Sequence, residues 1–293
     1  MKILTTPRLH RMWEGTWVQF LLGRNFHPVP SDRVADLLDP NNQFVYIGSS
    51  AEVCAAADYF IRSGVNFGAI VLSDELLRDE CQYIKYENCR FVMRNYVHPT
   101  LINEKKVSFF GLGYKTNFCK YLNHNSHLER EFIWNFIGTP HHVDRQQALE
   151  TFKAIDGHFI HLTEGFGSAD SLHISRYAEI INNSLYTLCP YGHYNADTFR
   201  VYEALEAGSV PIVPRNAPGL DFPVSYWSWL FRGEVPPFVM ASDWNEAREI
   251  VMDDLGSGRY IERMELCQLF WRKWKLQWRY DLLSNLDALI HIH

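Results

Sequence analysis

Short apolar runs alternate with helical patterns along the first half of the chain. Gln43 to Ile47 is rich in β-branched and aromatic residues, Phe67 to Leu72 is a second such run, and a helical pattern at Ala51 to Ser63 separates them. Cys89 to Met93 and Val107 to Leu112 repeat the pattern. Strands that read as continuous apolar runs are buried on both faces, as in parallel sheets covered by helices. The first half is therefore predicted to be an α/β domain with a parallel sheet.

A second alternating unit begins after residues 115–130, a polar and weakly periodic segment typical of a connector. Two successive α/β units predict two Rossmann-like domains rather than one wide sheet, and 293 residues are enough for two domains. The strands expected in the second unit are Phe132 to Ile137, His158 to Leu162, Leu185 to Leu188 and Val210 to Val213, and the helices are Asp144 to Ala154, Ser175 to Asn182 and Thr198 to Ala207.

The C-terminal stretch, Arg259 to Ile290, has helical periodicity, with Trp271, Trp274 and Trp278 on one face at i, i+3 and i+7. Aromatic residues interleaved with Lys and Arg also occur in proteins that bind membrane surfaces or nucleic acid. A stripe at helical spacing favours the simpler interpretation, a helix that packs its tryptophans on the rest of the protein. The expected organisation is an N-terminal domain of residues 1–130, a C-terminal domain of residues 131–258 and a helix of residues 259–293 that crosses back to the N-terminal domain.

Charge and composition exclude several classes of protein. The formal net charge is −6, whereas a nucleic-acid binder carries a basic excess, so we expect no nucleic-acid partner. No apolar run approaches the roughly 18 residues that indicate a transmembrane helix, and the first residues lack the apolar core of a secretory signal. Six cysteines without a C-x-x-C pair are typical of reduced thiols. We therefore expect a soluble, cytoplasmic protein without a transmembrane segment.

A strand, a glycine-containing loop and a helix follow one another between Leu185 and Val213. The loop begins at Cys189, contains Gly192 and ends in a polar stretch rich in helix-capping residues, and Gly208 stops the helix. The free N–H groups and the positive dipole end of such a helix favour phosphates. The segment therefore predicts a phosphate-binding edge of a parallel sheet.

Arg200 and Glu203 lie together on one face of that helix, beside the small Ala207. The arginine can hold a diphosphate with its fork of donors, and the carboxylate can accept the hydroxyls of a ribose, as acidic residues do in dinucleotide sites. An ordinary i,i+3 ion pair on a solvated helix face has the same spacing. The spacing alone leaves both interpretations open.

The run from Ser184 to Pro214 contains Leu-Cys-Pro-Tyr-Gly followed by Arg-Val-Tyr-Glu-Ala. These motifs resemble the C-terminal signature of exostosin-like glycosyltransferases, and within them the ribitol xylosyltransferase branch. Phe136-Ile137-Gly138-Thr139, with Arg145 after it, resembles the opening of that group's nucleotide-binding domain. The resemblance covers residues 132–214. Related sequences also occur in large algal viruses, a source that would suit a short chain without an anchor, whereas cellular members of the branch are membrane-anchored.

The resemblance implies the GT-B fold, in which two Rossmann-like domains face each other across a cleft. The C-terminal domain of such enzymes binds the nucleotide-sugar and the N-terminal domain presents the acceptor, here a glycan hydroxyl. Arg200 and Glu203 would then bind the donor. The other donor-side residues implied are Tyr191, Gly192, Asn195, Asp197 and Thr198 in the loop, with Thr139 and Arg145 near the diphosphate.

A metal is not expected, because the chain contains no Asp-x-Asp triplet, the usual carboxylate motif for a metal-bridged sugar diphosphate. His124, His127 and Glu129 have metal-like spacing, but they lie in a polar connector where such side chains are usually solvated. Arginine and the helix N-terminus would then stabilise the leaving group. No cofactor is expected beyond the UDP-sugar itself. Cys189 follows a buried strand and is interpreted as structural rather than nucleophilic.

An inverting transfer requires one base to deprotonate the acceptor hydroxyl. Asp74 and Glu75 follow the strand Phe67 to Leu72, at the sheet edge where α/β proteins place working residues. The competing interpretation is a helix cap, because Ser73-Asp74-Glu75 also opens an expected helix at Leu76 to Asp79. Further candidates for the base are Asp170, Glu164 and His98, and Arg94 and His98 are also expected on the acceptor side.

The sequence thus predicts a metal-independent, inverting GT-B glycosyltransferase that moves a sugar from a UDP-sugar to a glycan hydroxyl. Xylose from UDP-xylose is implied by the resemblance alone. A retaining GT-B enzyme is the nearest alternative. A non-catalytic two-domain α/β protein that binds a nucleotide or sugar is the alternative from another class.

Overall fold

The computed structural model describes residues 1–23, 28–31, 33–39, 41–123, 129–217, 219–220, 222 and 224–291. The chain forms two compact units. Unit 1 consists of Met1–Leu112 with Lys275–His293, and unit 2 of Gly113–Trp274. The connector 115–130 is thus part of unit 2, whereas the sequence-based boundary lies after residue 130. The final helix is shared between the two units.

Unit 1 contains a six-stranded parallel sheet in the order β2-β1-β3-β4-β5-β6. Each run expected from the sequence forms a strand at or near its predicted position. The strands β1 and β2 are not among the elements expected from the sequence. They are too short to contain a recognisable run of apolar residues. The bounds are β1 (Lys2–Thr5), β2 (Val29–Pro30), β3 (Phe44–Ser49), β4 (Phe67–Leu72), β5 (Cys89–Arg94) and β6 (Val107–Phe109).

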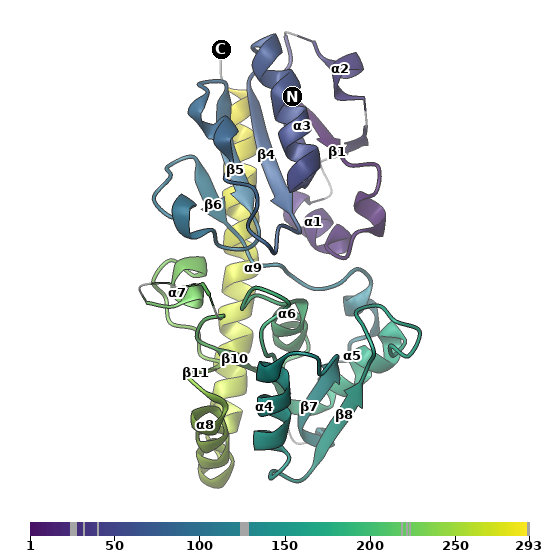
Figure 1. Ribbon diagram of the computed structural model, residues 1–293, viewed down its shortest axis with the longest axis vertical. Helices are drawn as coiled ribbons and strands as arrows, with labels where there is room; N and C mark the ends of the chain where they lie inside the picture. Colours follow the sequence, from purple (N-terminus) through teal and green to yellow (C-terminus); the bar gives the residue numbers. More distant parts are fainter. Residues whose placement is uncertain are drawn as a thin grey trace. The chain divides into compact units, whose positions relative to one another are not determined.

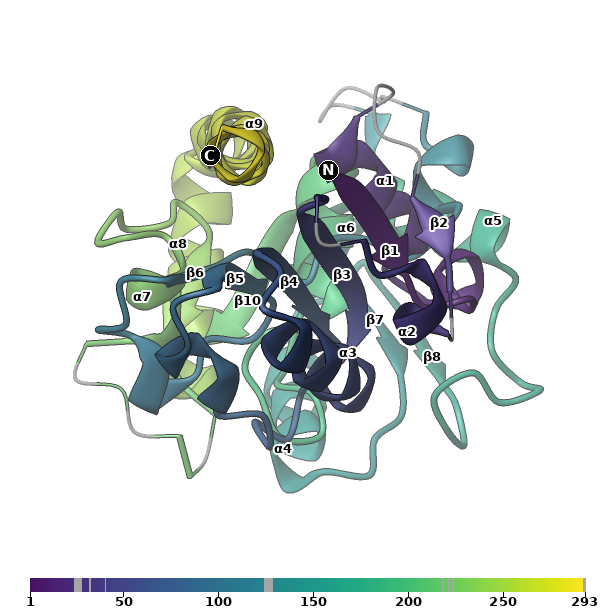
Figure 2. The same ribbon diagram turned by 90° about the horizontal axis from the view of Figure 1, so that it is seen from above.

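Helices lie on both faces of this sheet (Figures 1 and 2). The longest, α3 (Ser50–Ser63), begins at a capping box between Ser49 and Glu52 and ends at Gly64, whose φ of 71° is readily adopted only without a side chain. It covers one face, and α1 (Gly15–Leu22) lies on the other. The shorter helices of unit 1 are η1 (Leu9–Arg11), α2 (Val34–Leu37), η2 (Gln82–Lys85) and η3 (Pro99–Leu101).

Aromatic side chains fill the core of unit 1. The ring of Phe60 on α3 lies 5.3 Å from the ring of Phe44 and 5.2 Å from that of Phe67, on neighbouring strands. On the opposite face Trp17 of α1 packs edge-on against Trp278, with 6.2 Å between ring centroids. Contacts of this kind between fully buried rings stabilise the unit beyond the area they remove from water.

Unit 2 contains a five-stranded parallel sheet in the order β11-β10-β9-β7-β8. The first strand in the chain, β7, lies between the second and the third, so the direction of winding reverses between β7 and β9. Ligands of open α/β sheets bind at the carboxyl ends of the strands at such a switch point. The bounds are β7 (Phe132–Gly138), β8 (His158–Leu162), β9 (Ser184–Leu188), β10 (Val210–Pro214) and β11 (Val239–Ala241).

Buried polar side chains cross the centre of this sheet. Asn135 on β7 donates to the hydroxyl of Thr187 on β9 at 2.8 Å, and that hydroxyl lies 2.8 Å from the hydroxyl of Ser209, just before β10. All three residues are fully buried. Because a one-residue slip would leave these groups without partners, the chain of hydrogen bonds favours the observed register at the switch point.

The helices of unit 2 pack in pairs, α4 with α8 and α5 with α6. Gly208, with φ of 72°, ends α6 as expected, and a side chain there would collide with Arg130, which donates to the carbonyls of Ser184 and Ala207. The bounds are η4 (Phe118–Tyr121), α4 (Val143–Phe152), α5 (Ile174–Asn182), α6 (Phe199–Glu206), α7 (Tyr226–Leu230) and α8 (Trp244–Ser257).

The C-terminal stretch forms one long helix, α9 (Tyr260–Ile290) (Figure 1). The burial of its tryptophan stripe confirms the packing interpretation. Trp271, Trp274 and Trp278 are all buried. Trp271 packs on Tyr202 of α6, with 5.4 Å between ring centroids, and donates to Glu206. Among the described residues no helix combines the length and the apolarity needed to cross a bilayer. The two parallel sheets flanked by helices confirm the expected α/β fold class with two Rossmann-like domains.

Candidate functional site

Arg200, in the first turn of α6, reaches the carboxyl end of β7. Its Nη2 donates to the carbonyl of Ile137 at 2.9 Å, and its guanidinium lies over the ring of Phe136, 5.0 Å from the centroid. Gly138 makes this approach possible, since a Cβ there would lie 2.7 Å from Nη2. The arginine is thereby fixed at the switch point between β7 and β9. Its buried Nε has no hydrogen-bond partner in the part of the chain that the structure describes.

Two further residues near the start of α6 hold buried polar atoms without a partner. Asn195 is fully buried, and neither its Oδ1 nor its Nδ2 is hydrogen-bonded within the described ranges. Thr198 occupies the N-cap position in an extended conformation, but its hydroxyl caps no N–H and has no other described partner. Leaving a buried donor or acceptor unsatisfied costs about 1–3 kcal/mol, and such groups are rare in folded proteins. Their concentration beside Arg200 indicates a place where a polar ligand completes the hydrogen bonding.

The loop between β9 and α6 is held in shape by its own contacts. The N–H of Gly192 donates to the carbonyl of Asn195 at 2.7 Å, which closes a tight turn. Asp197 is buried and accepts a hydrogen bond from the hydroxyl of Tyr226 on α7 at 2.9 Å, so it anchors the loop to α7. The loop therefore presents its polar atoms from a fixed backbone.

Arg145 on α4 joins this loop to the end of β7. Its Nη1 donates to the hydroxyl of Thr139 at 2.6 Å, and its Nε and Nη2 donate to the carbonyl of Tyr191 at 3.3 and 3.2 Å. The structure thus brings together Thr139, Arg145 and Tyr191, which the sequence places up to 52 positions apart. The hydrogen bonds of Arg145 thus hold the segment after β7 and the loop after β9 in place on either side of the site.

Glu203 is fully buried and lies one turn further along α6. Its Oε2 accepts from the hydroxyl of Tyr177 at 2.5 Å, and its Oε1 accepts from the N–H of Lys115 at 3.2 Å, with Lys115 Nζ 3.8 Å away. Burial raises the pKa of Tyr177 well above its usual value, so the shared proton stays on the phenol. The surface ion pair between Arg200 and Glu203, considered from their spacing, is wrong, because Glu203 has no exposed surface and its described partners are Tyr177 and Lys115.

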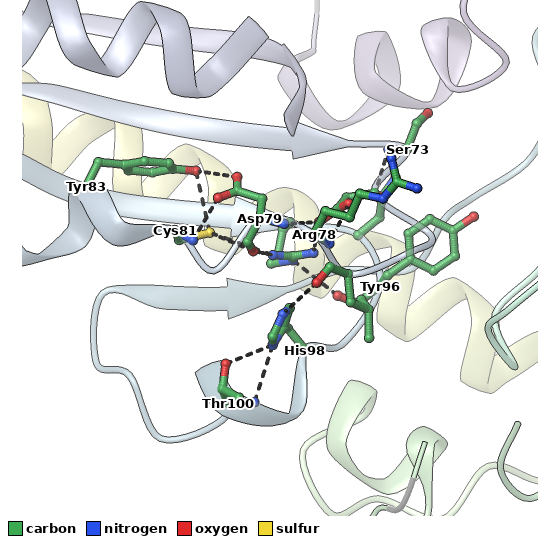
Figure 3. A network of polar contacts seen from close by, with 12 residues as sticks. Ser73, Arg78, Asp79, Cys81, Tyr83, Tyr96, His98 and Thr100 are labelled. Carbon is green, nitrogen blue, oxygen red and sulfur yellow. Dashed lines mark hydrogen bonds and ion pairs between the residues drawn. The ribbon is translucent and has the colours of Figure 1, made fainter. Parts of the chain in front are cut away.

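In unit 1, a network of polar contacts lies at the carboxyl edge of the sheet (Figure 3). Asp74 is buried and belongs to this network. Its Oδ1 accepts from the N–H of Arg78, and its Oδ2 accepts from the N–H of Asp79 and from Arg94 Nη2 at 2.9 Å. The helix expected at Leu76 to Asp79 is wrong, because a turn at Glu75 and Leu76 is followed by irregular structure at residues 77–79. Asp74 caps that turn, and both of its oxygens are engaged. Glu75 is half-buried.

Arg94 and His98, the acceptor-side candidates, are both buried. Arg94 also donates to the carbonyl of Asp79 at 2.6 Å and to that of Tyr96 at 3.3 Å. His98 Nδ1 accepts from the N–H of Thr100, so its Nε2 carries the proton and donates to the carbonyl of Leu77 at 3.1 Å. Burial lowers the pKa of His98, which favours this neutral form. His98 thereby links the loop after β5 to the loop after β4, and its place in the network is seen in Figure 3. Arg94, at the end of β5, hydrogen-bonds to both loops.

The remaining candidates lie on the surface of unit 2 or outside the described residues. Asp170 accepts from the hydroxyl of Ser168 and from the N–H of Glu164, and these hydrogen bonds, that from Ser168 most strongly, lower its pKa. His124 and His127 lie outside the described residues. Within the described ranges no group of three or more His, Cys, Asp or Glu side chains is arranged to hold a metal ion. Cys189 is fully buried, and burial raises the pKa of its thiol to about 12, which supports its interpretation as structural.

A group that the sequence analysis missed lies at the carboxyl edge of the unit 1 sheet. Ser73 donates its hydroxyl to Glu14 Oε1 and its N–H to Asn95 Oδ1. Glu14 and Asn95 are buried, and Glu14 Oε2 and Asn95 Nδ2 have no partner in the described parts of the chain. Burial raises the pKa of Glu14. The available signal was the isolation of Glu14 among tryptophans, in Met12-Trp13-Glu14-Gly15-Thr16-Trp17.

A groove of about 560 Å³ lies elsewhere in unit 2, between α4 and α8. Asp144 and Trp244 line it, and the indole N–H of Trp244 donates to Asp144 Oδ1 at 2.8 Å. None of the sequence-predicted site residues lines this groove. The residues that the structure brings together at the switch point therefore form the stronger candidate site.

Some known proteins resemble this chain in sequence, and others resemble it in fold alone. Ribitol-5-phosphate xylosyltransferase 1 of Mus musculus is 26% identical over 179 residues, which cover 57% of this chain and 40% of the mouse protein. The Homo sapiens protein of the same name is 23% identical over 174 residues, covering 55% of this chain and 39% of the human protein. The chain thus spans about two fifths of the length of these relatives. The structure of HepE from Anabaena, solved in complex with UDP, shares the fold with a TM-score of 0.55 at 8% identity, covering 98% of this chain and 100% of that chain.

A protein-family model identifies the family of this chain. Residues 115–288 match the model of the RXYLT1 C-terminal domain. The match begins near the start of unit 2 and continues through most of α9. Since it covers more than half of the 293 residues, the chain belongs to the RXYLT1 C-terminal domain family.

Proposed function

We propose that this protein is a glycosyltransferase whose unit 2 binds a UDP-sugar at the switch point between β7 and β9. The observation that carries the proposal is the set of buried, unpartnered polar atoms of Asn195, Thr198 and Arg200 around the N-terminus of α6. Family membership and the names of the curated relatives support the reaction class. The UDP held by HepE, which shares the fold, supports the nucleotide.

The diphosphate is the part of the donor that best suits this environment. Helix N-termini bind phosphates through free N–H groups and the helix dipole, and Arg200 adds a fixed guanidinium with an unused donor. The hydroxyl of Thr198 and the amide of Asn195 offer additional donors. Negative charge that develops on UDP as the glycosidic bond breaks would be stabilised by the same groups.

Glu203 remains our candidate for the ribose. Its Oε1 accepts from the Lys115 N–H at 3.2 Å, a longer hydrogen bond than the 2.5 Å one from Tyr177 to Oε2. A carboxylate oxygen can accept more than one hydrogen bond. The hydrogen bond from the Tyr177 hydroxyl orients the carboxylate. A ribose hydroxyl would be a further donor to Oε1.

We further propose xylose as the transferred sugar, a glycan hydroxyl as the acceptor, inversion at the anomeric carbon and independence of metal. The names of the curated relatives support xylose. The absence of Asp-x-Asp from the sequence and the positive charge of Arg200 support a metal-independent reaction. The reaction needs a single base, because one in-line attack by the acceptor oxygen displaces UDP.

The test is UDP release by the purified chain with a panel of UDP- and GDP-sugars, with carbohydrate acceptors and with or without EDTA. We expect release to be greatest with UDP-xylose and unchanged by EDTA, and NMR of the product to show a β-linkage from the α-configured donor. An α-linked product would replace the inverting mechanism with a retaining one. UDP binding without transfer to any acceptor would favour the non-catalytic alternative.

A further inference from the structure

Ser73 holds an unusual backbone conformation at the carboxyl end of β4. Its φ is 59°, a region that residues other than glycine rarely adopt. The N–H of Ser73 donates to Asn95 Oδ1 at 3.0 Å, which fixes this conformation from the end of the neighbouring strand β5. The side chain of Ser73 is exposed, whereas its hydrogen-bond acceptor, the carboxyl of Glu14, is buried. Strain that the surroundings enforce at a sheet edge often marks a functional position.

The group behind Ser73 is the carboxyl of Glu14. The Ser73 hydroxyl donates to Glu14 Oε1, and Glu14 is 1% exposed at the N-terminus of α1. Its Oε2 has no described partner, and the groups that affect its titration are Ser73, Asn95 and its own backbone rather than a cation. Burial therefore raises its pKa toward the range in which a carboxylate accepts protons effectively.

This arrangement differs from that of the base candidates named from the sequence. Both oxygens of Asp74 are committed to the turn and to Arg94. Glu14, in contrast, has a free oxygen within the described contacts and is linked to the surface by one hydroxyl. The Glu14–Ser73 pair thus combines a buried carboxylate with an exposed hydroxyl that can contact a substrate.

Resting on the proposed function, we propose that Ser73 and Glu14 form a proton relay for the acceptor hydroxyl. The acceptor O–H donates its proton to Ser73 Oγ, and Ser73 passes its own proton to Glu14 Oε1. The acceptor oxygen attacks the anomeric carbon, and the bond from that carbon to the phosphate oxygen breaks. UDP leaves with the bonding electrons, and Glu14 afterwards returns the proton to solvent. Ser73 is the catalytic residue in contact with substrate, Glu14 is the terminal base, and Asn95 is a positioning residue.

The test compares turnover and UDP affinity for four variants. Glu14→Gln should lower kcat about 100-fold or more, the usual contribution of general base catalysis. The Kd for UDP should stay within about twofold of wild type, because a base acts in the chemical step and not in nucleotide binding. Ser73→Gly removes the hydroxyl and accepts the positive φ without strain, so it should fold and lose activity similarly. Glu14→Asp should restore part of the activity. Glu52→Gln, a carboxyl of the α3 capping box at the same edge, is the matched control and should retain activity once folding is verified.

The pH profile separates a base from a structural residue. In wild type the kcat should fall as pH decreases through the raised pKa of Glu14, and the residual activity of Glu14→Gln should lack that acidic limb. A loss of less than tenfold in Glu14→Gln or in Ser73→Gly, with wild type active, overturns the relay alone. A wild type that releases no UDP from any donor and acceptor overturns the proposed function and the relay with it.

Discussion

The guanidinium of Arg200 occupies the space that a side chain at position 138 would fill. A Cβ on Gly138 would lie 2.7 Å from Arg200 Nη2. The glycine and the arginine are 62 positions apart in the sequence, and their contact at the end of β7 determines where the guanidinium lies. The proposed donor site therefore depends on the absence of a side chain at position 138 as much as on the positive charge of Arg200.

Gly138→Ala should displace Arg200 and weaken UDP binding. The substitution also introduces a side chain at a φ of 149°. We expect a loss of about tenfold in affinity, or about 1.4 kcal/mol, measured by calorimetry. Gly165→Ala is the control, because a Cβ there would meet its nearest neighbour at 3.8 Å. Equal UDP affinity for the two alanine variants would contradict this role of Gly138.

Thr198→Val should weaken UDP binding without weakening the fold. The Thr198 hydroxyl has no partner in the described structure, so its removal deprives a bound phosphate of a donor but no protein atom of one. We expect a roughly tenfold higher Kd, as for the loss of a hydrogen bond to a charged group, and an unfolding free energy that is unchanged or higher.

Thr187→Val, in contrast to Thr198→Val, should weaken the fold. Its hydroxyl is bonded to Asn135 and Ser209 inside the sheet, so its loss should reduce the unfolding free energy by about 1–3 kcal/mol. Urea unfolding measures both variants. If Thr198→Val were the less stable of the two, the Thr198 hydroxyl would have a structural rather than a binding role.

Asp74 and Glu75 should respond differently to neutralisation. Arg94→Met would leave Asp74 as an uncompensated buried charge, and we expect a loss of about 3–5 kcal/mol in unfolding free energy. Asp74→Asn should also destabilise, and Glu75→Gln should destabilise less, because Asp74 is buried and Glu75 is only half-buried. Turnover measured on the folded proteins then tests the base assignment made from the sequence. A folded Asp74→Asn protein that has lost turnover but retained UDP affinity would support Asp74 over Glu14.

Glu14→Gln should be more stable than wild type at neutral pH. The pKa of Glu14 is raised in the folded state by burial, so the folded protein binds this proton more tightly than the unfolded chain. The contribution of Glu14 to stability is therefore most favourable below the unfolded pKa, and it decreases as pH rises through the folded pKa. Unfolding free energies at pH 7.5 and at pH values approaching the unfolded pKa of about 4.3 should show the advantage of the variant shrinking as pH falls. A variant less stable than wild type at pH 7.5 would show that the carboxylate is stabilised where it lies.

Local patterns were sufficient for much of the fold but not for the acid–base groups. The strands β4 and β9 are buried on both faces and therefore read as apolar runs, and Gly208 marks the end of α6 because its φ is positive. The turn after Asp74 resembled a helix start because its capping residues are the same, and Arg94, which fixes the turn, lies 20 positions away. The partner of Glu14 is 59 positions away, so only the folded chain reveals the pair.

At the proposed donor site, the motif pointed to the candidate residues, and the structure shows which of their polar atoms already have partners. Asn195, Thr198 and Arg200 retain unpartnered polar atoms in the described structure, while Arg145 and Asp197 hold the surrounding walls. That distinction depends on which atoms already have partners. Neither spacing nor resemblance contains this information.

Calorimetric titration of UDP into wild type, Arg200→Ala and Arg176→Ala tests the central claim most directly. Arg176 is a half-exposed arginine of unit 2, paired with Glu179 on α5, and controls for the loss of one positive charge. We expect saturable binding of one UDP to wild type, an affinity at least about tenfold lower in Arg200→Ala, and wild-type affinity in Arg176→Ala. No binding to wild type, or equal affinity in the two folded alanine variants, would contradict the central claim.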